Sequence, residues 1–175
     1  MKRIEIDPND LNVDIIRIWG QQYFLLTAGE HKPGKFNTMT VAWGSLGVMW
    51  GKPFAQAVVR PSRYTHGFMD SGDTFTLSAF PPEHSDALML LGTRSGRDGD
   101  KIKESGLTPI DSQNVAAPGF NEAELILECR KIYRDEMKPG LFLDPKTEGN
   151  YNGSDYHTIY FGEIVAVSGV EKYKS

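Results

Sequence analysis

The chain has little cysteine, no long apolar run and no surplus of positive charge. One cysteine, Cys129, among 175 residues excludes an intramolecular disulfide framework and a thiolate zinc cluster. No segment approaches the ~18 uninterrupted apolar residues of a membrane-spanning helix. The first ten residues, MKRIEIDPND, lack the apolar run of a secretory signal. These absences together predict a cytoplasmic protein.

The charge balance argues against a nucleic-acid partner. The formal net charge is −4, the isoelectric point is near 5.6, and lysine and arginine are scattered along the chain. A nucleic-acid-binding surface would need a basic stripe to neutralise phosphates. Hydrophobic content of 39% and charged content of 24% are typical of globular proteins. We therefore expect a single domain over residues 1–175, large enough to bury roughly 70% of the surface of the unfolded chain.

Several common enzyme motifs are also missing. The chain has no phosphate-binding G-x-x-x-x-G-K-[ST], no zinc-binding H-E-x-x-H and no G-x-S-x-G nucleophile turn. The glycine-rich WGSLGVMWG lacks the dinucleotide-binding spacing, and no helix is expected after it. Cys129 falls on the inward parity of an expected strand, which favours a buried, inert thiol over a nucleophile. No metal site is predicted, because the four histidines lie far apart: His31, His66, His84 and His157.

Short strands dominate what is present. In DTFTLSAF, residues 73–80, apolar and polar side chains alternate as in a half-buried strand. The other expected strands are 23–28, 38–44, 54–60, 123–133 and 156–167, the last with a bulge at Gly162. A glycine-rich turn and Lys52-Pro53 are expected to separate 38–44 from 54–60. The expected helices are 62–72, capped by Ser62, then 83–91 and 99–106, and 135–154 is expected to be a loop. This pattern predicts a mainly β fold with a few helices, arranged as a barrel or a sandwich.

The segment FNTMTVAWGSLGVMWGKPF, residues 36–54, is unusually aromatic and polar for a strand region. It holds two of the three tryptophans and two of the six methionines. A flat heteroaromatic ligand needs backbone donors and acceptors along its polar edge and apolar surface against its face. A strand with Asn37, Thr40 and the small Ala42 fits this need, with Met39 or Trp43 packing nearby. The alternative is a strand whose tryptophans and methionines fill the core.

The segment RPSRYT, residues 60–65, has the composition of an anion site. A helix capped by Ser62 would point its first N–H groups outward, and Arg60 and Arg63 add full positive charges. Hydroxyls of Ser62 and Thr65 add donors suited to a phosphate monoester. The alternative is an ordinary serine cap with two solvated arginines. Residues 37–43 suit a flat ring and residues 60–65 suit a phosphate. Together they predict a site for FMN, which joins a tricyclic ring to one phosphate through a ribityl chain.

An ordered set of motifs gives the chain a family resemblance. The set begins with residues 37–44, an N-x-M-T-x-x-W-G pattern, and continues with RPSRYTHGFMDSGDTFTLSAF, SGRDGDKIKESGLTP, LECRKIY and DYHTIYFGEIVAV. From about Tyr23 to Val167 the chain resembles the flavin reductase-like, FMN-binding split-barrel family, which includes flavoredoxin-type electron carriers.

The resemblance implies a homodimer of split β-barrels with FMN near the subunit interface. The flavin-binding strand would map onto Asn37, Thr38, Met39, Thr40, Val41, Ala42 and Trp43, and the phosphate-binding turn onto Arg60, Ser62, Arg63 and Thr65. Ser78, Ala79 and Phe80 would lie beside the isoalloxazine ring, and Lys101 would lie near the phosphate. His157 matches a histidine that in reductase members lies near the nicotinamide, so it is a candidate substrate-binding residue. Here Tyr156 separates it from Asp155, whereas the family has Asp directly before His. A structural hydrogen bond is the alternative role.

The implied activity is that of an NAD(P)H-dependent flavin or ferric reductase. NADH or NADPH would pass hydride to N5 of FMN, and electrons would leave to free flavin, a ferric complex or an acceptor protein. In such an enzyme the cofactor performs the chemistry and the protein places and tunes it. One alternative is a flavoredoxin-like carrier with no nicotinamide site of its own. The other is a β-barrel scaffold that binds no flavin.

Overall fold

One large antiparallel sheet organises the computed structural model, which describes residues 2–175. Seven strands follow the order β3-β2-β6-β9-β10-β5-β4, and β1 pairs with β10. Their bounds are β1 Ile4–Ile6, β2 Phe24–Gly29, β3 Phe36–Val41, β4 Gly44–Met49, β5 Lys52–Val59, β6 Thr74–Ala79, β9 Leu125–Glu136 and β10 Thr158–Gly169. A second, two-stranded sheet joins β7 Pro109–Ile110 to β8 Gly119–Phe120. Because β3 and β4 do not pair with each other, the large sheet remains open.

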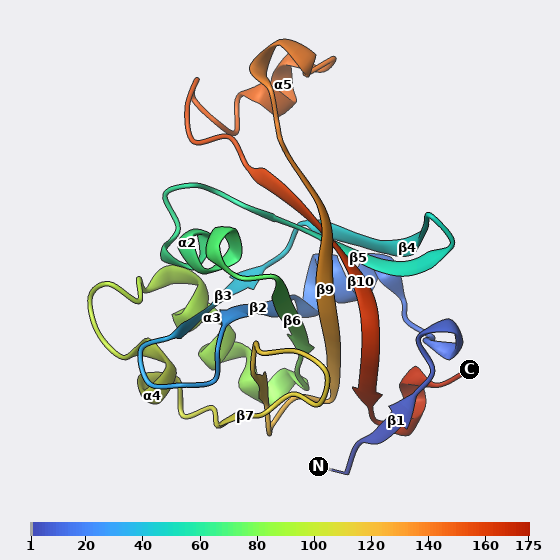
Figure 1. The fold of residues 1–175 in the computed structure, drawn as a ribbon. Coiled ribbons are helices and arrows are strands. Elements are labelled where there is room, and N and C mark those ends of the chain that lie inside the picture. Colours follow the sequence, from blue (N-terminus) through green and yellow to red (C-terminus); the bar gives the residue numbers. More distant parts are fainter. Residues whose placement is uncertain (1) are drawn as a thin grey trace.

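Three of the five helices in residues 2–175 lie around β2 and β3. The bounds are α1 Ile15–Arg17, α2 Tyr64–Ser71, α3 Ser85–Thr93, α4 Lys101–Ser105 and α5 Pro145–Glu148. Helices α2, α3 and α4 lie beside β2 and β3, at the left of Figure 1. Residues 137–157, which we call the arm, carry α5 away from the rest of the molecule beyond the ends of β9 and β10 (Figure 1). Strand β1 and the end of β10, with which it pairs, lie at the opposite end of the molecule (Figure 1).

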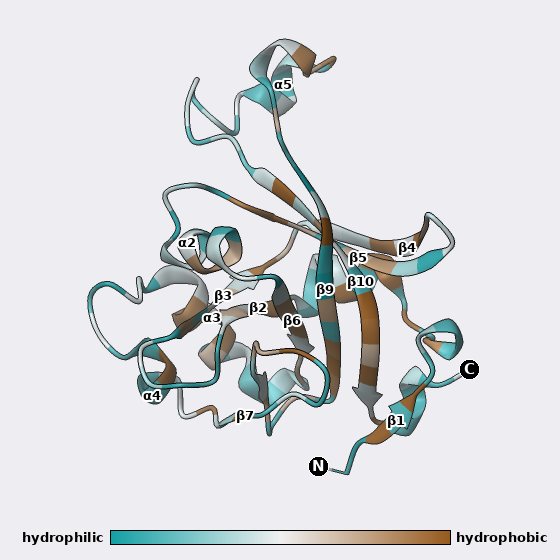
Figure 2. Ribbon diagram, viewed as in Figure 1, coloured by the Kyte–Doolittle hydropathy of each residue, from teal (hydrophilic) through white to brown (hydrophobic). Residues whose placement is uncertain are grey.

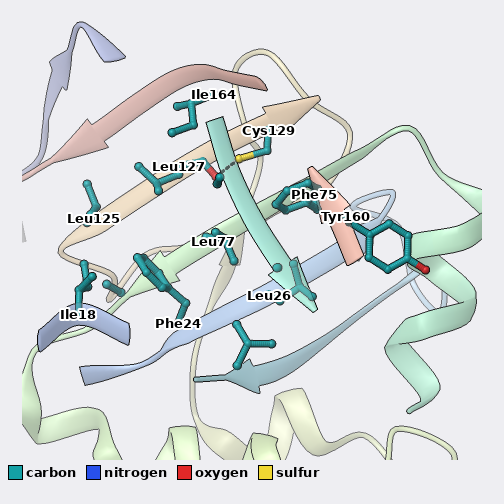
Figure 3. Packing of buried hydrophobic residues seen from close by; sticks show 14 of the residues in the cluster. Ile18, Phe24, Leu26, Phe75, Leu77, Leu125, Leu127, Cys129, Tyr160 and Ile164 are labelled. Atoms are coloured by element: carbon teal, nitrogen blue, oxygen red, sulfur yellow. Dashed lines mark hydrogen bonds between the residues drawn. The ribbon is translucent and has the colours of Figure 1, made fainter. Parts of the chain in front are cut away.

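The core lies on both faces of the central strands. Phe24 and Leu26 of β2 belong to the larger apolar cluster, whereas Leu25, between them, belongs to a second cluster that packs beneath α3. Burial of both faces explains why residues 23–28 form a continuous apolar run instead of an alternating one. Figure 2 shows brown and teal bands alternating along β9. Figure 3 shows the side chains that β2, β6, β9 and β10 contribute to the larger cluster, among them Phe24, Leu26, Phe75, Leu77, Leu127 and Tyr160.

Most expected elements are confirmed within a few residues. The strands expected at 23–28, 54–60, 73–80, 123–133 and 156–167 are β2, β5, β6, β9 and β10. The helices expected at 62–72, 83–91 and 99–106 are α2, α3 and α4. The pairing of β10 with β9 shifts register at Gly162, which confirms the expected irregularity. Cys129 is fully buried, and burial raises the pKa of its thiol, as expected of an inert cysteine.

The prediction was wrong about the segment after β3. The strand expected over 38–44 ends at Val41, and strand β4 begins at Gly44 and includes residues 45–49, which were expected to lie in a turn. Strands β4 and β5 form a hairpin whose two connecting residues, Trp50 and Gly51, have φ of 53° and 70°. Such left-handed pairs match the twist of a two-residue hairpin. The small residues that suggested a turn therefore belong to an edge strand, and the expected loop at 135–154 likewise includes the end of β9 and the short α5.

Gly44 shows why small residues occur in β4. A Cβ atom at this position would lie 2.3 Å from Cη2 of Trp19 and 2.3 Å from the carbonyl oxygen of Gln56. Trp19 is buried in the larger cluster, so the tryptophan ring occupies the space that a side chain at residue 44 would need.

Within residues 2–175, no helix is long and apolar enough to cross a membrane.

Candidate functional site

Strand β3 is an edge strand beside two helices. Among residues 2–175 it pairs with β2 alone, so its other edge keeps backbone N–H and C=O groups free of sheet partners. The Thr38 hydroxyl points into the core, where it donates to the carbonyl oxygen of Leu26 at 3.1 Å. Thr40 donates to the carbonyl oxygen of Leu88 in α3 at 2.5 Å. The hydroxyls of both threonines are therefore satisfied by hydrogen bonds within the protein. The unpaired backbone edge of β3 is what this strand offers to a ligand.

A cavity of about 350 Å³ opens between β3, the turn before α2, and the segment that joins α3 to α4. Asn37 lines this cavity, and its side-chain amide donates to Oγ1 of Thr65 at 2.7 Å. The residues that line the cavity are Asn37, Met39, Arg60, Ser62, Arg63, Tyr64, Thr65, Leu91, Thr93, Arg94, Ser95, Gly96, Arg97 and Lys101. We call it the cationic cavity because five of these side chains are arginine or lysine.

Three of these cations have no carboxylate partner within the described part of the chain: Arg63, Arg97 and Lys101. Arg63 donates to the carbonyl oxygen of Gly92 at 3.2 Å. Arg97 donates to the carbonyl oxygen of Ser62 at 3.1 Å, with its guanidinium carbon 5.0 Å from the centre of the Tyr64 ring. Carbonyl groups and an aromatic face fix the arginines without neutralising them. The cavity consequently has an uncompensated positive charge that favours an anion.

Lys101 is the buried member of this group, at 4% exposed. Its Nζ donates to the carbonyl oxygens of Leu91 at 2.8 Å and Arg94 at 3.0 Å, which leaves one N–H of the ammonium for a ligand. Burial, and then the nearby charge of Arg63, lower the pKa of Lys101 to about 8. A bound anion would relieve both the burial penalty and the repulsion between the two cations.

The structure corrects the expected role of Ser62. No side chain caps the N terminus of α2, whose N-cap residue is Arg63. Ser62 instead donates its backbone N–H to Oδ1 of Asp155 at 2.9 Å and its hydroxyl to Oδ2 at 2.6 Å. The turn at residues 60–62 is thus bound to the arm, because a carboxylate 93 residues away satisfies its donors.

A second cavity of about 200 Å³ continues along β3 beyond the first. We call it the aromatic cavity because Trp43 and His157 form one wall, with ring centres 5.2 Å apart. Nδ1 of His157 is hydrogen-bonded to the Tyr151 hydroxyl at 2.9 Å. Burial, and then the charge of Arg60, lower the pKa of His157 to about 4, so the imidazole is neutral at pH 7. Met39, Arg60 and Arg63 border both cavities.

A third cavity, the largest of the three at about 870 Å³, also borders Thr40. The turn Ile18–Gln22, helix α3 and the segment from Phe80 to Pro82 form its walls. Tyr23, at its edge, has φ of 65°, a left-handed conformation that is uncommon outside glycine. The cavity shares Thr40 with the aromatic cavity and Thr93 with the cationic cavity, so all three border the same stretch of β3 and α3.

Most of the residues expected at the site come together at the first two cavities. These are Asn37, Met39, Thr40, Val41, Ala42, Trp43, Arg60, Ser62, Arg63, Thr65, Lys101 and His157. Thr38 borders neither cavity, and its side chain is fully buried. Ser78 and Ala79 lie in β6, two strands away from β3, and line none of the three cavities described above. Phe80 borders only the largest cavity.

Sequence reasoning missed the segment 94–97 as part of the site. Ser95, Gly96 and Arg97 line the cationic cavity, and Arg97 is one of its three unpaired cations. A Cβ atom at Gly96 would lie 2.4 Å from Oδ1 of Asn37 and 2.8 Å from Cδ1 of Tyr64. Only glycine therefore permits this close approach to β3. The signal was present in the sequence, because SGRDGDK, which begins at Ser95, contains both Arg97 and Lys101.

Comparison with known proteins agrees with this arrangement. The model of the flavin reductase like domain matches residues 17–175, and the chain belongs to this family. Among solved structures, the FMN-binding domain of a flavin reductases-like enzyme from Shewanella baltica OS155 aligns with a TM-score of 0.68 and 14% identity, over 96% of this chain and 77% of that one. The flavoredoxin of Desulfovibrio vulgaris (Miyazaki F) aligns with a TM-score of 0.68 and 22% identity, over 92% and 75%.

A third similar structure is a split-barrel protein from Shewanella frigidimarina NCIMB 400. It aligns with a TM-score of 0.67 and 17% identity, over 86% of this chain and 68% of that one. At such identities the likeness concerns the fold. The open antiparallel sheet accordingly has the split-barrel fold of these FMN-binding domains, as the sequence predicted.

Proposed function

We propose that the protein is an FMN-dependent oxidoreductase that uses NADH or NADPH as electron donor. In this proposal the phosphate of FMN occupies the cationic cavity and the isoalloxazine ring lies along the free edge of β3 in the aromatic cavity. When bound, FMN would supply the hydride and electron chemistry. The chain's own contribution is to bind, orient and shield the cofactor.

The observation that carries the proposal is the convergence of Arg63, Arg97 and Lys101, all without carboxylate partners among residues 2–175, on a cavity that borders an unpaired strand edge. A phosphate suits three cations fixed by carbonyl groups, because it accepts several charge-assisted hydrogen bonds at once. The adjoining edge of β3 offers backbone donors and acceptors to the polar side of a flat ring. The shared wall of the two cavities is consistent with one ligand that extends through both.

His157 and Trp43 would form the outer wall of the ring site. The imidazole of His157 is hydrogen-bonded to the Tyr151 hydroxyl and is neutral at pH 7. It can therefore pack against the uncharged ring of a cofactor without burying an unpaired charge. We assign His157 to the nicotinamide side of this wall as part of the proposal. Its hydrogen bond to Tyr151 also gives it a structural role, so the two expected roles are compatible.

The visible spectrum of the purified protein is the first test. FMN bound stoichiometrically, or taken up on addition, supports the proposal, whereas a protein that never takes up FMN is a scaffold of another kind. Anaerobic titration with NADH and NADPH then separates a reductase from a carrier. Bleaching by either nicotinamide supports the reductase. If photoreduced protein passes electrons onward but neither nicotinamide reduces it, the protein is a flavoredoxin-like carrier.

We further propose that the protein functions as a homodimer. Support comes from large apolar side chains exposed on two projecting parts, the β4–β5 hairpin and the arm. Val48 and Trp50 are 73% and 63% exposed, and Leu143 is 99% exposed. Sedimentation equilibrium tests this: we expect a mass of two chains, and a shift toward one chain when Trp50 is replaced by Asp. A single-chain mass for the unsubstituted protein would contradict it.

A further inference from the structure

The arm is bound to the turn that borders the cationic cavity, and Arg60 makes most of the connection. Its Nη2 donates to the carbonyl oxygen of Asn150 at 2.9 Å. Its guanidinium carbon lies 5.0 Å from the centre of the Tyr151 ring. Its Nη1 lies 3.8 Å from Oδ2 of Asp155. Two of the five cations that line the cavity already have a carboxylate partner: Arg60 pairs with Asp155, and Arg94 pairs with Glu104.

Asp155 completes this connection by accepting both donors of Ser62. The backbone N–H reaches Oδ1 at 2.9 Å and the hydroxyl reaches Oδ2 at 2.6 Å. The backbone of Asp155 has φ of 57°, a left-handed conformation that is uncommon outside glycine. The surrounding contacts evidently maintain this conformation, which presents the carboxylate to the turn.

Ser62 and Arg60 line the cationic cavity, whereas Asp155 does not. A carboxylate and a phosphate seek the same donors, because both are anionic oxygen acceptors that form charge-assisted hydrogen bonds. While Asp155 is in place, the hydroxyl of Ser62 and part of the charge of Arg60 are unavailable to a ligand in the cavity. The carboxylate also adds a negative charge behind the wall of an anion site.

We propose that Asp155 is an internal competitor of the phosphate, which limits the affinity of the cationic cavity for phosphorylated ligands. The competition itself follows from the geometry for any phosphate, and its application to FMN rests on the function proposed above. Its consequence is that FMN exchanges with solution more readily than the number of cations in the cavity would suggest. Asp155 thereby determines specificity without touching the reacting atoms.

The variant Asp155→Asn tests the proposal. Asparagine keeps an oxygen that can accept from the Ser62 N–H, so the turn stays anchored. It removes the negative charge and releases the Ser62 hydroxyl to the cavity. We expect FMN to bind about tenfold more tightly, because the released hydroxyl can donate to the phosphate and one partly screened negative charge is removed. The affinity for riboflavin, which lacks the phosphate, should not change.

The matched control is Asp144→Asn on the same arm. Asp144 accepts from the N–H of Lys146 and lies outside the contacts with the turn, so this variant makes the same change in net charge elsewhere. We expect no change in FMN affinity. In a Ser62→Ala background, the gain from Asp155→Asn should shrink, because no hydroxyl is left to release. The same gain in both backgrounds would come from charge alone and would overturn the competition for the Ser62 hydroxyl.

Inorganic phosphate gives a readout that is independent of flavin. Line broadening of its ³¹P resonance should indicate tighter binding to the Asp155→Asn variant, even if neither flavin binds and the proposed function is wrong. In the unsubstituted protein, the ¹³C resonance of the Asp155 carboxyl group should shift when phosphate is added. Unchanged or weaker phosphate binding by the variant would overturn the proposal, and so would an Asp155 resonance that does not move.

Discussion

Replacement of Arg63 by alanine addresses the assignment of the phosphate most directly. Arg63 borders both the cationic and the aromatic cavity, and within residues 2–175 no carboxylate pairs with it. A charge-assisted hydrogen bond contributes about 1.5–3 kcal/mol, so the variant should bind FMN roughly 10- to 150-fold more weakly. Because riboflavin has the ring and the ribityl chain but no phosphate, its affinity should change far less.

The protonation of Lys101 decides the pH at which this loss should be measured. The charge of Arg63 is one cause of the lowered pKa of Lys101, so removing it raises that pKa from about 8. At pH 7 a lysine with this pKa is already about nine-tenths protonated, and full protonation adds less than about 0.1 kcal/mol to anion binding. Compensation is therefore negligible at pH 7 and grows above pH 8. The measurement belongs at pH 7.

Quenching of flavin fluorescence, or isothermal titration calorimetry, would give both affinities for each variant. Arg130→Ala is a suitable control, because Arg130 is exposed in β9 and lines none of the three cavities beside β3. Its removal tests the effect of net charge alone, and we expect little change for either flavin. Equal losses of FMN and riboflavin affinity in Arg63→Ala would show that Arg63 does not bind the phosphate, and the orientation proposed for the cofactor would be wrong.

Three further predictions follow from the same geometry. The affinity for FMN should fall as pH rises above about 8, where Lys101 loses the proton that attracts phosphate, and Lys101→Gln should abolish this dependence in flavin titrations. Stability should fall as pH drops from 6.5 to 4, because the unfolded chain protonates His157 more readily than the folded one; in urea melts, His157→Phe should remove up to about 3 kcal/mol of this loss. Gly96→Ala should displace Asn37, break its hydrogen bond to Thr65 and lower the free energy of unfolding by about 1–3 kcal/mol, whereas an unchanged melting curve would show that Asn37 can move freely.

The elements that sequence reasoning located are those with a local signal. Alternation in residues 73–80 identifies β6, and the continuous apolar run at 23–28 identifies a strand buried on both faces. Strand β4 lacked such a signal, because the glycine at residue 44 makes room for Trp19, a residue of a different segment. Packing between segments distant in sequence determined this element, and composition alone suggested a turn.

The same distinction applies to the candidate site. Arg60, Arg63 and Lys101 could be assigned because they occur in compact motifs. The actual partner of Ser62 could not be predicted, since Asp155 lies 93 residues away and no local pattern connects them. A serine before a helix is a strong local sign of a cap, yet here a tertiary contact takes its place.

The wall shared by the cationic and aromatic cavities has a consequence for engineering this protein. Met39, Arg60 and Arg63 border both, so a substitution there alters the surroundings of both ends of the proposed cofactor. Retention of the cofactor and its midpoint potential would therefore change together. Independent adjustment would require positions that border one cavity only: Arg97 for retention, and Trp43 for the potential.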